Sequence, residues 1–151
     1  REKELVILDD VLLGYYSDAA AQPSGRPIAQ GWMSSPYGKR VDPISGKQAW
    51  HAGMDFAGRQ GSDVITVANG VVTYAGRRDG YGLMVEISHG NDVSTRYGHH
   101  DALSVTPGQT VKRGDVIGQM GSSGRSTGPH VHFEVLRKGK AINPAKFVNR
   151  G

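Results

Sequence analysis

The sequence predicts an all-β domain, mainly an antiparallel β-sandwich, with a short helix at its N-terminal end. Glycine accounts for 22 of the 151 residues, about twice the usual share of roughly 7%, and the glycines stand between short β-branched runs. The dipeptide Asn69-Gly70 separates two such runs, and it is a strong signal for a two-residue hairpin turn. With 37% apolar residues, the chain is long enough to bury one hydrophobic core.

The first 22 residues carry a different pattern from the rest of the chain. Apolar side chains recur there at steps of three and four residues, at Leu5, Leu8, Val11, Leu12 and Tyr15. This spacing predicts an amphipathic helix, which is either the end of a longer upstream helix or coiled coil, or a helix packed on the domain. Residues 22–27 hold two prolines and a glycine and predict a linker. We therefore assign residues 1–22 to a helix and linker, and residues 23–151 to one domain.

From residue 28 onward, short β-branched runs alternate with turn residues. The expected strands lie at 64–67, 71–74, 83–87, 93–97, 110–111, 116–120 and 131–136. Asn69-Gly70 predicts that the first two form a hairpin, and Lys138-Gly139-Lys140 predicts a hairpin after the last. Residues 144–147 are expected to form a turn. Residues 111–118 also resemble a half-repeat of biotinyl or lipoyl carriers, but the chain has no Met-Lys or Asp-Lys dipeptide, so we expect a related strand pattern and not a carrier.

Composition excludes several kinds of site. There is no cysteine, so the chain has no disulfide framework, thiolate metal site or cysteine nucleophile. The net charge of +4 suits an acidic partner such as a cell-wall polymer, nucleic acid or lipid head groups, and it equally suits an ordinary surface. No apolar run approaches the roughly 20 residues of a membrane span. The chain begins with Arg1 and shows no signal-peptide pattern, so we expect a fragment or mature form whose targeting segment is missing.

Two histidines lie two residues apart in the run Pro129-His130-Val131-His132-Phe133-Glu134-Val135. Side chains at positions i and i+2 of a strand share one face, about 6.6 Å apart along it. The valines and the phenylalanine are therefore expected to face the core, and His130, His132 and Glu134 to line the opposite face. Three exposed polar residues on the wet side of a strand would give the same pattern.

Two further segments could contribute to one site. His51 and Asp55 lie four residues apart in a glycine-containing stretch, which favours convergence from a loop into a strand over a helix. His99 follows Tyr97 at the end of another strand, and the two are expected to share a face. Each of these taken singly is well explained as a solvated or core residue. Together they offer the three His and Asp ligands of a catalytic zinc site, with two histidines left over to act on water.

These blocks resemble a known family. In their order along the chain, they resemble the motifs of the lysostaphin/LytM-type zinc metallopeptidases. The four blocks are the stretch Gly31 to Gly38, His51-x-x-x-Asp55, Tyr97-x-His99 and the run Gly128 to Glu134. Enzymes of this family cleave the peptide stems or cross-bridges of bacterial peptidoglycan. The resemblance extends from about residue 27 to residue 147.

The resemblance implies a role for each of five residues. His51, Asp55 and His132 would bind one zinc ion, and His99 and His130 would be the catalytic histidines beside it. Relatives that act only as binding or activating domains lack one or more of these positions, whereas this chain has all five. In the implied mechanism, zinc lowers the pKa of its bound water to about 7 and polarises the scissile carbonyl. One histidine takes a proton from that water, and the other stabilises the oxyanion or protonates the leaving amine; the sequence leaves these two roles open.

Three further polar residues lie in or near these motifs. Glu134 either orients a histidine or is a surface glutamate. His100 stands where the family has an apolar residue and is expected to alter the pocket wall more than the chemistry. His89 is expected to be a turn residue without a metal role.

We expect the cleft to be lined by the loops around 37–50, 77–82 and 121–128. Arg125, in the Gly/Ser/Thr-rich stretch 121–128, and Tyr97 are the candidates for substrate contact. A plain flexible turn would explain the stretch 121–128 equally well.

The resemblance implies a zinc-dependent endopeptidase that hydrolyses peptide cross-links of peptidoglycan, and the D-alanyl–diaminopimelate bond is the first choice among these cross-links. It implies an exported protein of the periplasm or cell envelope whose partner is peptidoglycan and not nucleic acid, with a regulatory domain or protein partner as a further expectation. The alternative is a non-catalytic peptidoglycan-binding regulator that activates a separate amidase.

Overall fold

A computed structural model describes residues 22–149 of the chain, except 43, 125 and 127. The strands in this part are β1 (Trp32–Ser35), β2 (Gly38–Val41), β3 (Gln48–His51), β4 (Met54–Ala57), β5 (Asp63–Ile65), β6 (Gly70–Arg78), β7 (Gly82–Gly90), β8 (Val93–Leu103), β9 (Thr110–Val111), β10 (Val116–Met120), β11 (His130–Arg137) and β12 (Lys140–Ile142). They are followed by a short helix, α2 (Ala145–Val148). The expected N-terminal helix over 1–22 falls almost entirely outside the described residues.

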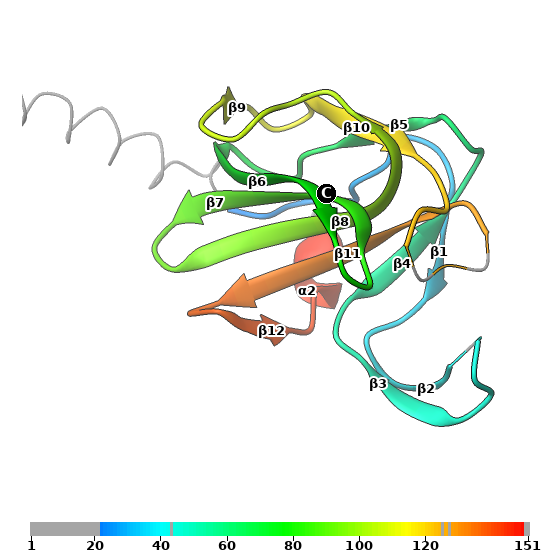
Figure 1. Cartoon of the computed structure of the whole chain (residues 1–151). Coiled ribbons are helices and arrows are strands. Elements are labelled where there is room, and N and C mark those ends of the chain that lie inside the picture. The colour runs from blue at the N-terminus through cyan, green and yellow to red at the C-terminus, as the bar shows by residue number, and fades with distance from the viewer. Residues whose placement is uncertain (1–21, 43, 125, 127, 150–151) are drawn as a thin grey trace, which may run out of the picture.

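The strands form one large antiparallel sheet and a separate hairpin (Figure 1). The sheet runs in the order β1-β4-β11-β8-β7-β6-β9, with β10 joined to β8 and β5 and with β12 joined to β11. The β2–β3 hairpin projects from the body of the domain. The predicted all-β, antiparallel fold is therefore confirmed, and the helical turn expected at 144–147 is α2.

Strand β8 joins the two layers of the fold. Its first half pairs with β7 and β11, whereas its last residues pair with β10. Between the halves, His99 has a positive φ of 68°, and the pairing with β7 shifts by one residue between Leu83 and Val85. An extra residue of this kind is a β-bulge, which bends a strand and increases its twist. The bend lets β8 leave one layer and enter the other.

The core lies between these layers and is built by alternating side chains. Strand β11 contributes Val131, Phe133 and Val135, all fully buried. Phe56 of β4 packs edge-on against Phe133. Val64, Ile117 and Met120 of β5 and β10 close the other side. Burying a side chain of this size stabilises the fold by roughly 1.5–3 kcal/mol.

The hairpin predicted at Asn69-Gly70 is wrong. Strand β5 pairs with β10, and β6 pairs with β7 and β9. Asn69 makes tertiary hydrogen bonds instead of a hairpin turn. Its backbone carbonyl accepts from the His89 ring, and its side-chain oxygen accepts from the backbone N–H of Arg113. Gly70 has no room for a side chain, because a Cβ would lie 2.4 Å from the Ser88 carbonyl oxygen. The hairpin predicted at Lys138-Gly139 is confirmed, and both residues have positive φ.

A chain of polar side chains runs through the core. The His89 ring donates from Nδ1 to the Asn69 carbonyl at 2.6 Å, and its Nε2 lies 2.8 Å from the Thr95 hydroxyl. The Thr95 hydroxyl is 2.8 Å from the Tyr97 hydroxyl, whose oxygen accepts from the Val67 N–H. Because Nδ1 of neutral His89 carries the proton, Nε2 must accept from Thr95. His89 is thus a buried strand residue and not the expected turn residue.

His89 makes the stability of the fold depend on pH. Burial, assisted by the nearby charge of Arg113, lowers the pKa of His89 to about 4 from its ordinary value of 6.5. Above pH 6.5 the ring is neutral in the folded and unfolded chain. Between pH 6.5 and 4 the unfolded chain binds a proton that the folded chain does not, so the free energy of unfolding falls with decreasing pH, by about 3 kcal/mol in total.

We expect His89→Gln, which keeps a donor and an acceptor but does not titrate, to show a shallower decline of stability over this range. Urea unfolding at several pH values between 7 and 4.5 measures both slopes. Equal slopes for the wild-type chain and the variant would contradict the assignment.

Candidate metal centre

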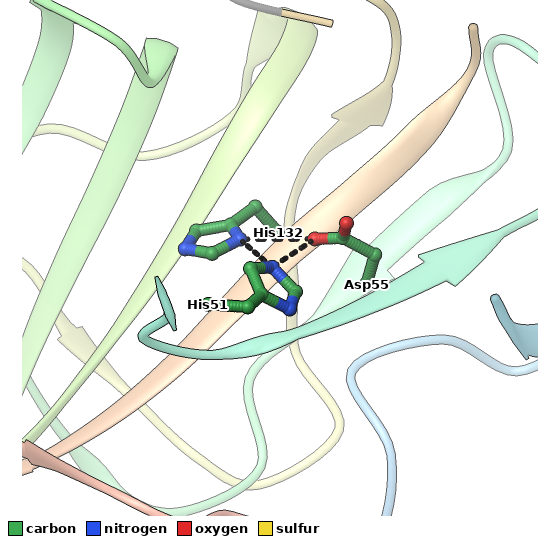
Figure 2. A group of neighbouring side chains, drawn as sticks. All are labelled: His51, Asp55 and His132. Carbon is green, nitrogen blue, oxygen red and sulfur yellow. Dashed lines mark hydrogen bonds and ion pairs between the residues drawn. The ribbon is translucent and has the colours of Figure 1, made fainter. Parts of the chain in front are cut away.

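Three potential metal ligands from three strands meet at one point (Figure 2). They are His51 at the end of β3, Asp55 of β4 and His132 of β11. The Nδ1 atom of His132 lies 2.9 Å from Oδ1 of Asp55, and Nε2 of His51 lies 3.2 Å from each of these two atoms. The ligand atoms all lie within 4.8 Å of one another, which is the arrangement that one small cation requires.

Strand pairing fixes this convergence. Strand β11 pairs with β4 so that His132 stands opposite Asp55, and residues opposite each other in an antiparallel pair point to the same face. His51 reaches them through the tight connection between β3 and β4. Gly53 in this connection lies so close to β11 that a Cβ would be 2.3 Å from the Phe133 carbonyl oxygen. A side chain there would push His51 away from the other two ligands.

The outer nitrogens of both histidines have acceptors. Nδ1 of His51 donates to the Pro36 carbonyl at 2.8 Å, and Nε2 of His132 donates to Oε2 of Glu134 at 2.8 Å. These contacts hold the rings so that Nε2 of His51 and Nδ1 of His132 face Asp55. Two imidazole nitrogens, each supported from behind, and one carboxylate oxygen match the protein ligands of a catalytic zinc site. The residues therefore fit zinc.

The two carboxylates keep this cluster charged. Burial of Asp55 disfavours its charged form, but hydrogen bonds from His132 and His51 hold the pKa of Asp55 far below its usual range. The pKa of Glu134 is also lowered, because the hydrogen bond from His132 outweighs the burial of this carboxyl group. Against the cost of burial, hydrogen bonds to Asp55 and Glu134 raise the pKa of His132 to about 9. A metal cation competes with this proton for the same lone pair.

His99 and His130 stand beside the cluster. Their rings are 4.6 Å apart, and Nε2 of His130 lies 3.8 Å from Oδ1 of Asp55. Nδ1 of His99 donates to the Ser123 carbonyl, and Nδ1 of His130 to the Gly128 carbonyl. Each ring therefore has its Nδ1 held by the backbone. Burial lowers the pKa of His99 to about 4, so this ring is neutral near pH 7. The structure thus brings together all five residues that the sequence selected as ligands and catalytic histidines.

The expectation that Tyr97 shares a face with His99 and contacts substrate is wrong. Tyr97 is fully buried in the core, and its hydroxyl belongs to the polar chain that includes Thr95. The bulge and the positive φ at His99 reverse the alternation of β8 between these two residues. Arg125, the other expected substrate contact, lies outside the described residues.

His100 lies behind the site and is completely buried. Its Nδ1 donates to the Leu83 carbonyl at 3.0 Å, and its ring occupies the space over Gly118, where a Cβ would come within 2.6 Å of the ring. It is a core residue, and its expected effect on the pocket wall stays a prediction.

Sequence reasoning missed two residues that touch the site. Tyr81, in the turn between β6 and β7, donates to both oxygens of Glu134 and lies with its ring 5.9 Å from that of His132. Arg96 of β8 lies with Nη1 3.6 Å from Oε1 of Glu134. An aromatic residue between two glycines in an expected cleft loop was the available signal for Tyr81. No local pattern marks Arg96, because its place opposite Glu134 depends on strand register.

An antiparallel β-domain with a His-Asp-His cluster and two flanking histidines defines a metallopeptidase-like architecture. Residues 49–144 match Peptidase family M23, and the chain belongs to this family. This confirms the resemblance to lysostaphin/LytM-type enzymes that the sequence motifs indicated.

The relatives include both enzymes and activators. The chain is 46% identical over 122 residues to the DD-carboxypeptidase/endopeptidase Mpg of Neisseria meningitidis, covering 81% of this chain and 28% of the relative. It is 39% identical to the peptidoglycan DD-endopeptidase ShyA of Vibrio cholerae, covering 80% and 28%. It is also 36% identical to the murein hydrolase activator NlpD of Escherichia coli, covering 78% and 31%. The chain thus spans less than a third of the length of these relatives.

Solved structures share the fold. A zinc-containing peptidase from Vibrio cholerae superposes with a TM-score of 0.74 at 34% identity, covering 81% of this chain and 39% of that chain. The catalytic domain of lysostaphin from Staphylococcus simulans gives a TM-score of 0.70 at 30% identity, covering 79% and 92%.

The structural role of Tyr97 can be tested by removing its hydroxyl. We expect Tyr97→Phe to lower the free energy of unfolding by roughly 1–3 kcal/mol, because the Val67 N–H and the Thr95 hydroxyl lose a buried partner. Urea unfolding measures this loss. Tyr74→Phe, which removes a more exposed hydroxyl, is the matched control and is expected to change stability by less than about 1 kcal/mol. A Tyr97→Phe chain as stable as the control would contradict the buried network.

Proposed function

We propose that this chain is a zinc-dependent endopeptidase that hydrolyses peptide cross-links of bacterial peptidoglycan in the cell envelope. The observation that carries the proposal is the convergence of His51, Asp55 and His132 beside His99 and His130. The family supplies the reaction class, because peptidases of this kind act on peptide bonds. Among the helices that the structure describes, none is long and apolar enough to cross a membrane.

His51, Asp55 and His132 would hold the zinc ion through Nε2, Oδ1 and Nδ1. When bound, zinc is a Lewis acid that acidifies water and polarises the scissile carbonyl. The remaining steps belong to His99 and His130. Both have their Nδ1 protons fixed on backbone carbonyls, so Nε2 is the atom that receives or delivers a proton. One ring takes the proton of the attacking water, and the other stabilises the developing oxyanion or protonates the leaving amine.

The bond we propose is the D-alanyl–diaminopimelate cross-link. Two relatives, at 46% and 39% identity, are named as a DD-carboxypeptidase/endopeptidase and a peptidoglycan DD-endopeptidase, and this supports a cross-link of that kind over a glycyl-glycine bridge. The substrate partner is then the peptide stem of peptidoglycan, and a separate regulatory domain or protein remains part of the proposal.

A second candidate is a non-catalytic regulator that activates a separate amidase. The similarity to the murein hydrolase activator NlpD favours it. The complete set of five site residues favours the enzyme, because a regulator needs neither the metal ligands nor the two flanking histidines. The two candidates differ in whether the purified chain alone cleaves peptidoglycan.

Metal removal is expected to abolish cleavage. Purified cross-linked peptidoglycan incubated with the chain should lose its cross-linked dimers, as read by mass spectrometry of the released muropeptides, and the masses identify the bond. A chelator should stop this loss and added zinc should restore it, whereas His51→Ala should bind no stoichiometric zinc and remain inactive. Lys140→Ala, an exposed residue of β12, is the control. Zinc bound one-to-one without cleavage of any wall type would favour the regulator.

The flanking histidines are expected to act on rate and not on metal binding. We expect His99→Ala and His130→Ala each to lower kcat by roughly 10²-fold or more, the usual contribution of a general acid or base. Both variants should keep one zinc ion per chain, because neither ring is among the three converging ligands. Loss of zinc in either variant, or full activity in both, would refute the assigned roles.

A further inference from the structure

A row of polar side chains crosses the sheet from the metal centre. Glu134 of β11 stands opposite Arg96 of β8, and Arg96 stands opposite Glu86 of β7. These strands lie side by side in the sheet (Figure 1). Directly opposed residues point to the same face, so the row lies on the face that carries His132. The row ends at Thr73 of β6, whose hydroxyl donates to Glu86 at 2.9 Å.

Glu134 is held from three sides. His132 donates to Oε2 at 2.8 Å, the Tyr81 hydroxyl lies 3.0 and 3.1 Å from the two oxygens, and Nη1 of Arg96 lies 3.6 Å from Oε1. The side chain of Glu134 is only 6% exposed. A buried carboxylate without partners is costly, so these three contacts determine where the carboxylate lies.

Arg96 is itself held in place by other side chains, so it cannot move freely together with Glu134. Its Nε donates to Oε2 of Glu86 at 2.7 Å, and its Nη1 donates to the Tyr81 hydroxyl at 3.3 Å. The guanidinium also lies 5.9 Å from the centre of the Tyr81 ring. A planar guanidinium that bonds two partners at once fixes the direction of its hydrogen bonds as well as the position of its charge. The ammonium group of a lysine would not fix that direction.

The hydrogen bonds of the row form a consistent set. The one proton of the Tyr81 hydroxyl is used on Glu134, so its oxygen accepts from Arg96. Glu134 can only accept, so the proton in the contact with His132 belongs to Nε2. Nδ1 of His132 then points at Asp55 and His51, and the other ring nitrogen points away from them (Figure 2).

We propose that Arg96 and Tyr81 are positioning residues that hold Glu134 so that His132 presents Nδ1 to the metal. This inference rests on the proposed zinc-dependent function. Neither side chain touches the three ligand atoms. Both act through Glu134, which orients the His132 ring and fixes the nitrogen that remains free to coordinate.

Zinc affinity tests the inference without reference to catalysis. The probe is zinc alone, titrated in competition with a chromogenic chelator. We expect Arg96→Met and Tyr81→Phe each to weaken zinc binding by roughly tenfold or more, the usual cost of losing a residue that orients a ligand. Arg96→Lys should recover only part of the loss, because it keeps the charge and not the second hydrogen bond. Arg137→Met, an exposed arginine on the same strand as Glu134, is the matched control.

Two further readouts separate positioning from a merely structural role. A structural role would lower the Tm by the same amount with zinc and with chelator, whereas a positioning role reduces the gain in Tm that zinc produces. In the zinc-loaded wild-type chain, ¹⁵N spectra of the imidazole should show the His132 proton on Nε2. Tyr81→Phe removes only one hydroxyl, so it provides the test if Arg96→Met does not fold.

The outcomes are distinct. A wild-type chain that binds no zinc overturns the proposed function, and the inference with it. A wild-type chain that binds zinc, with both variants within twofold of it, overturns the inference alone. A His132 proton found on Nδ1 in the zinc-loaded chain also overturns the inference alone.

Discussion

The antiparallel pairing of β11 with β4 and β8 is the constraint on which the rest of the structure depends. Successive side chains of β11 point to opposite faces, so one strand supplies both the core and the site. Val131, Phe133 and Val135 are fully buried on one face, and His130, His132 and Glu134 line the other. A register slip of one residue would exchange these two sets. Packing of the phenylalanine and valines therefore fixes the positions of the ligands.

The site concentrates charge in a buried place, and each charge is compensated there. Asp55 accepts from His132 and lies 3.2 Å from Nε2 of His51, and Glu134 accepts from His132 and Tyr81. Burial of unpaired carboxylates would be strongly destabilising. Because each carboxylate is paired, both stay ionised although they are buried, and a divalent cation can take the place of the proton that His132 shares with Asp55. The same hydrogen bonds that stabilise the fold thus hold the side chains of the candidate metal centre in place.

The bend in β8 links the architecture of the domain to its proposed chemistry. The strand must cross between layers to pair with both β11 and β10. The bulge that permits this places His99 on the site face, while Tyr97 two residues earlier stays in the core. A positive φ at a non-glycine residue is uncommon, and here it occurs at a residue to which we assign a role in proton transfer. Backbone geometry unusual for its residue type is often found at functional sites.

The sequence by itself determined what depends on local pattern. Turn residues between β-branched runs predicted the antiparallel β-fold, and the alternation around His130 and His132 predicted which side chains of that strand are buried. The glycines around His51 and Asp55 likewise argued against a helix there, and in the structure His51 ends β3 and Asp55 lies in β4. Motifs of this kind can be recognised because the residues that act together are close in sequence, and their relative orientation follows from strand geometry.

Only the tertiary structure decided which strands pair and which long-range contacts form. The Asn69-Gly70 dipeptide indicated a hairpin, but Asn69 bonds His89 and Arg113 instead, so β5 and β6 pair with other strands. Tyr97 and His99 occupy opposite environments because a single bulge reverses the alternation. Arg96 carries no local signal, and Tyr81 carries only that of an aromatic residue between two glycines, since their contacts with Glu134 join residues 38 and 53 positions apart in the chain. Register, bulges and cross-strand neighbours arise when the whole sheet assembles, and no short segment encodes them.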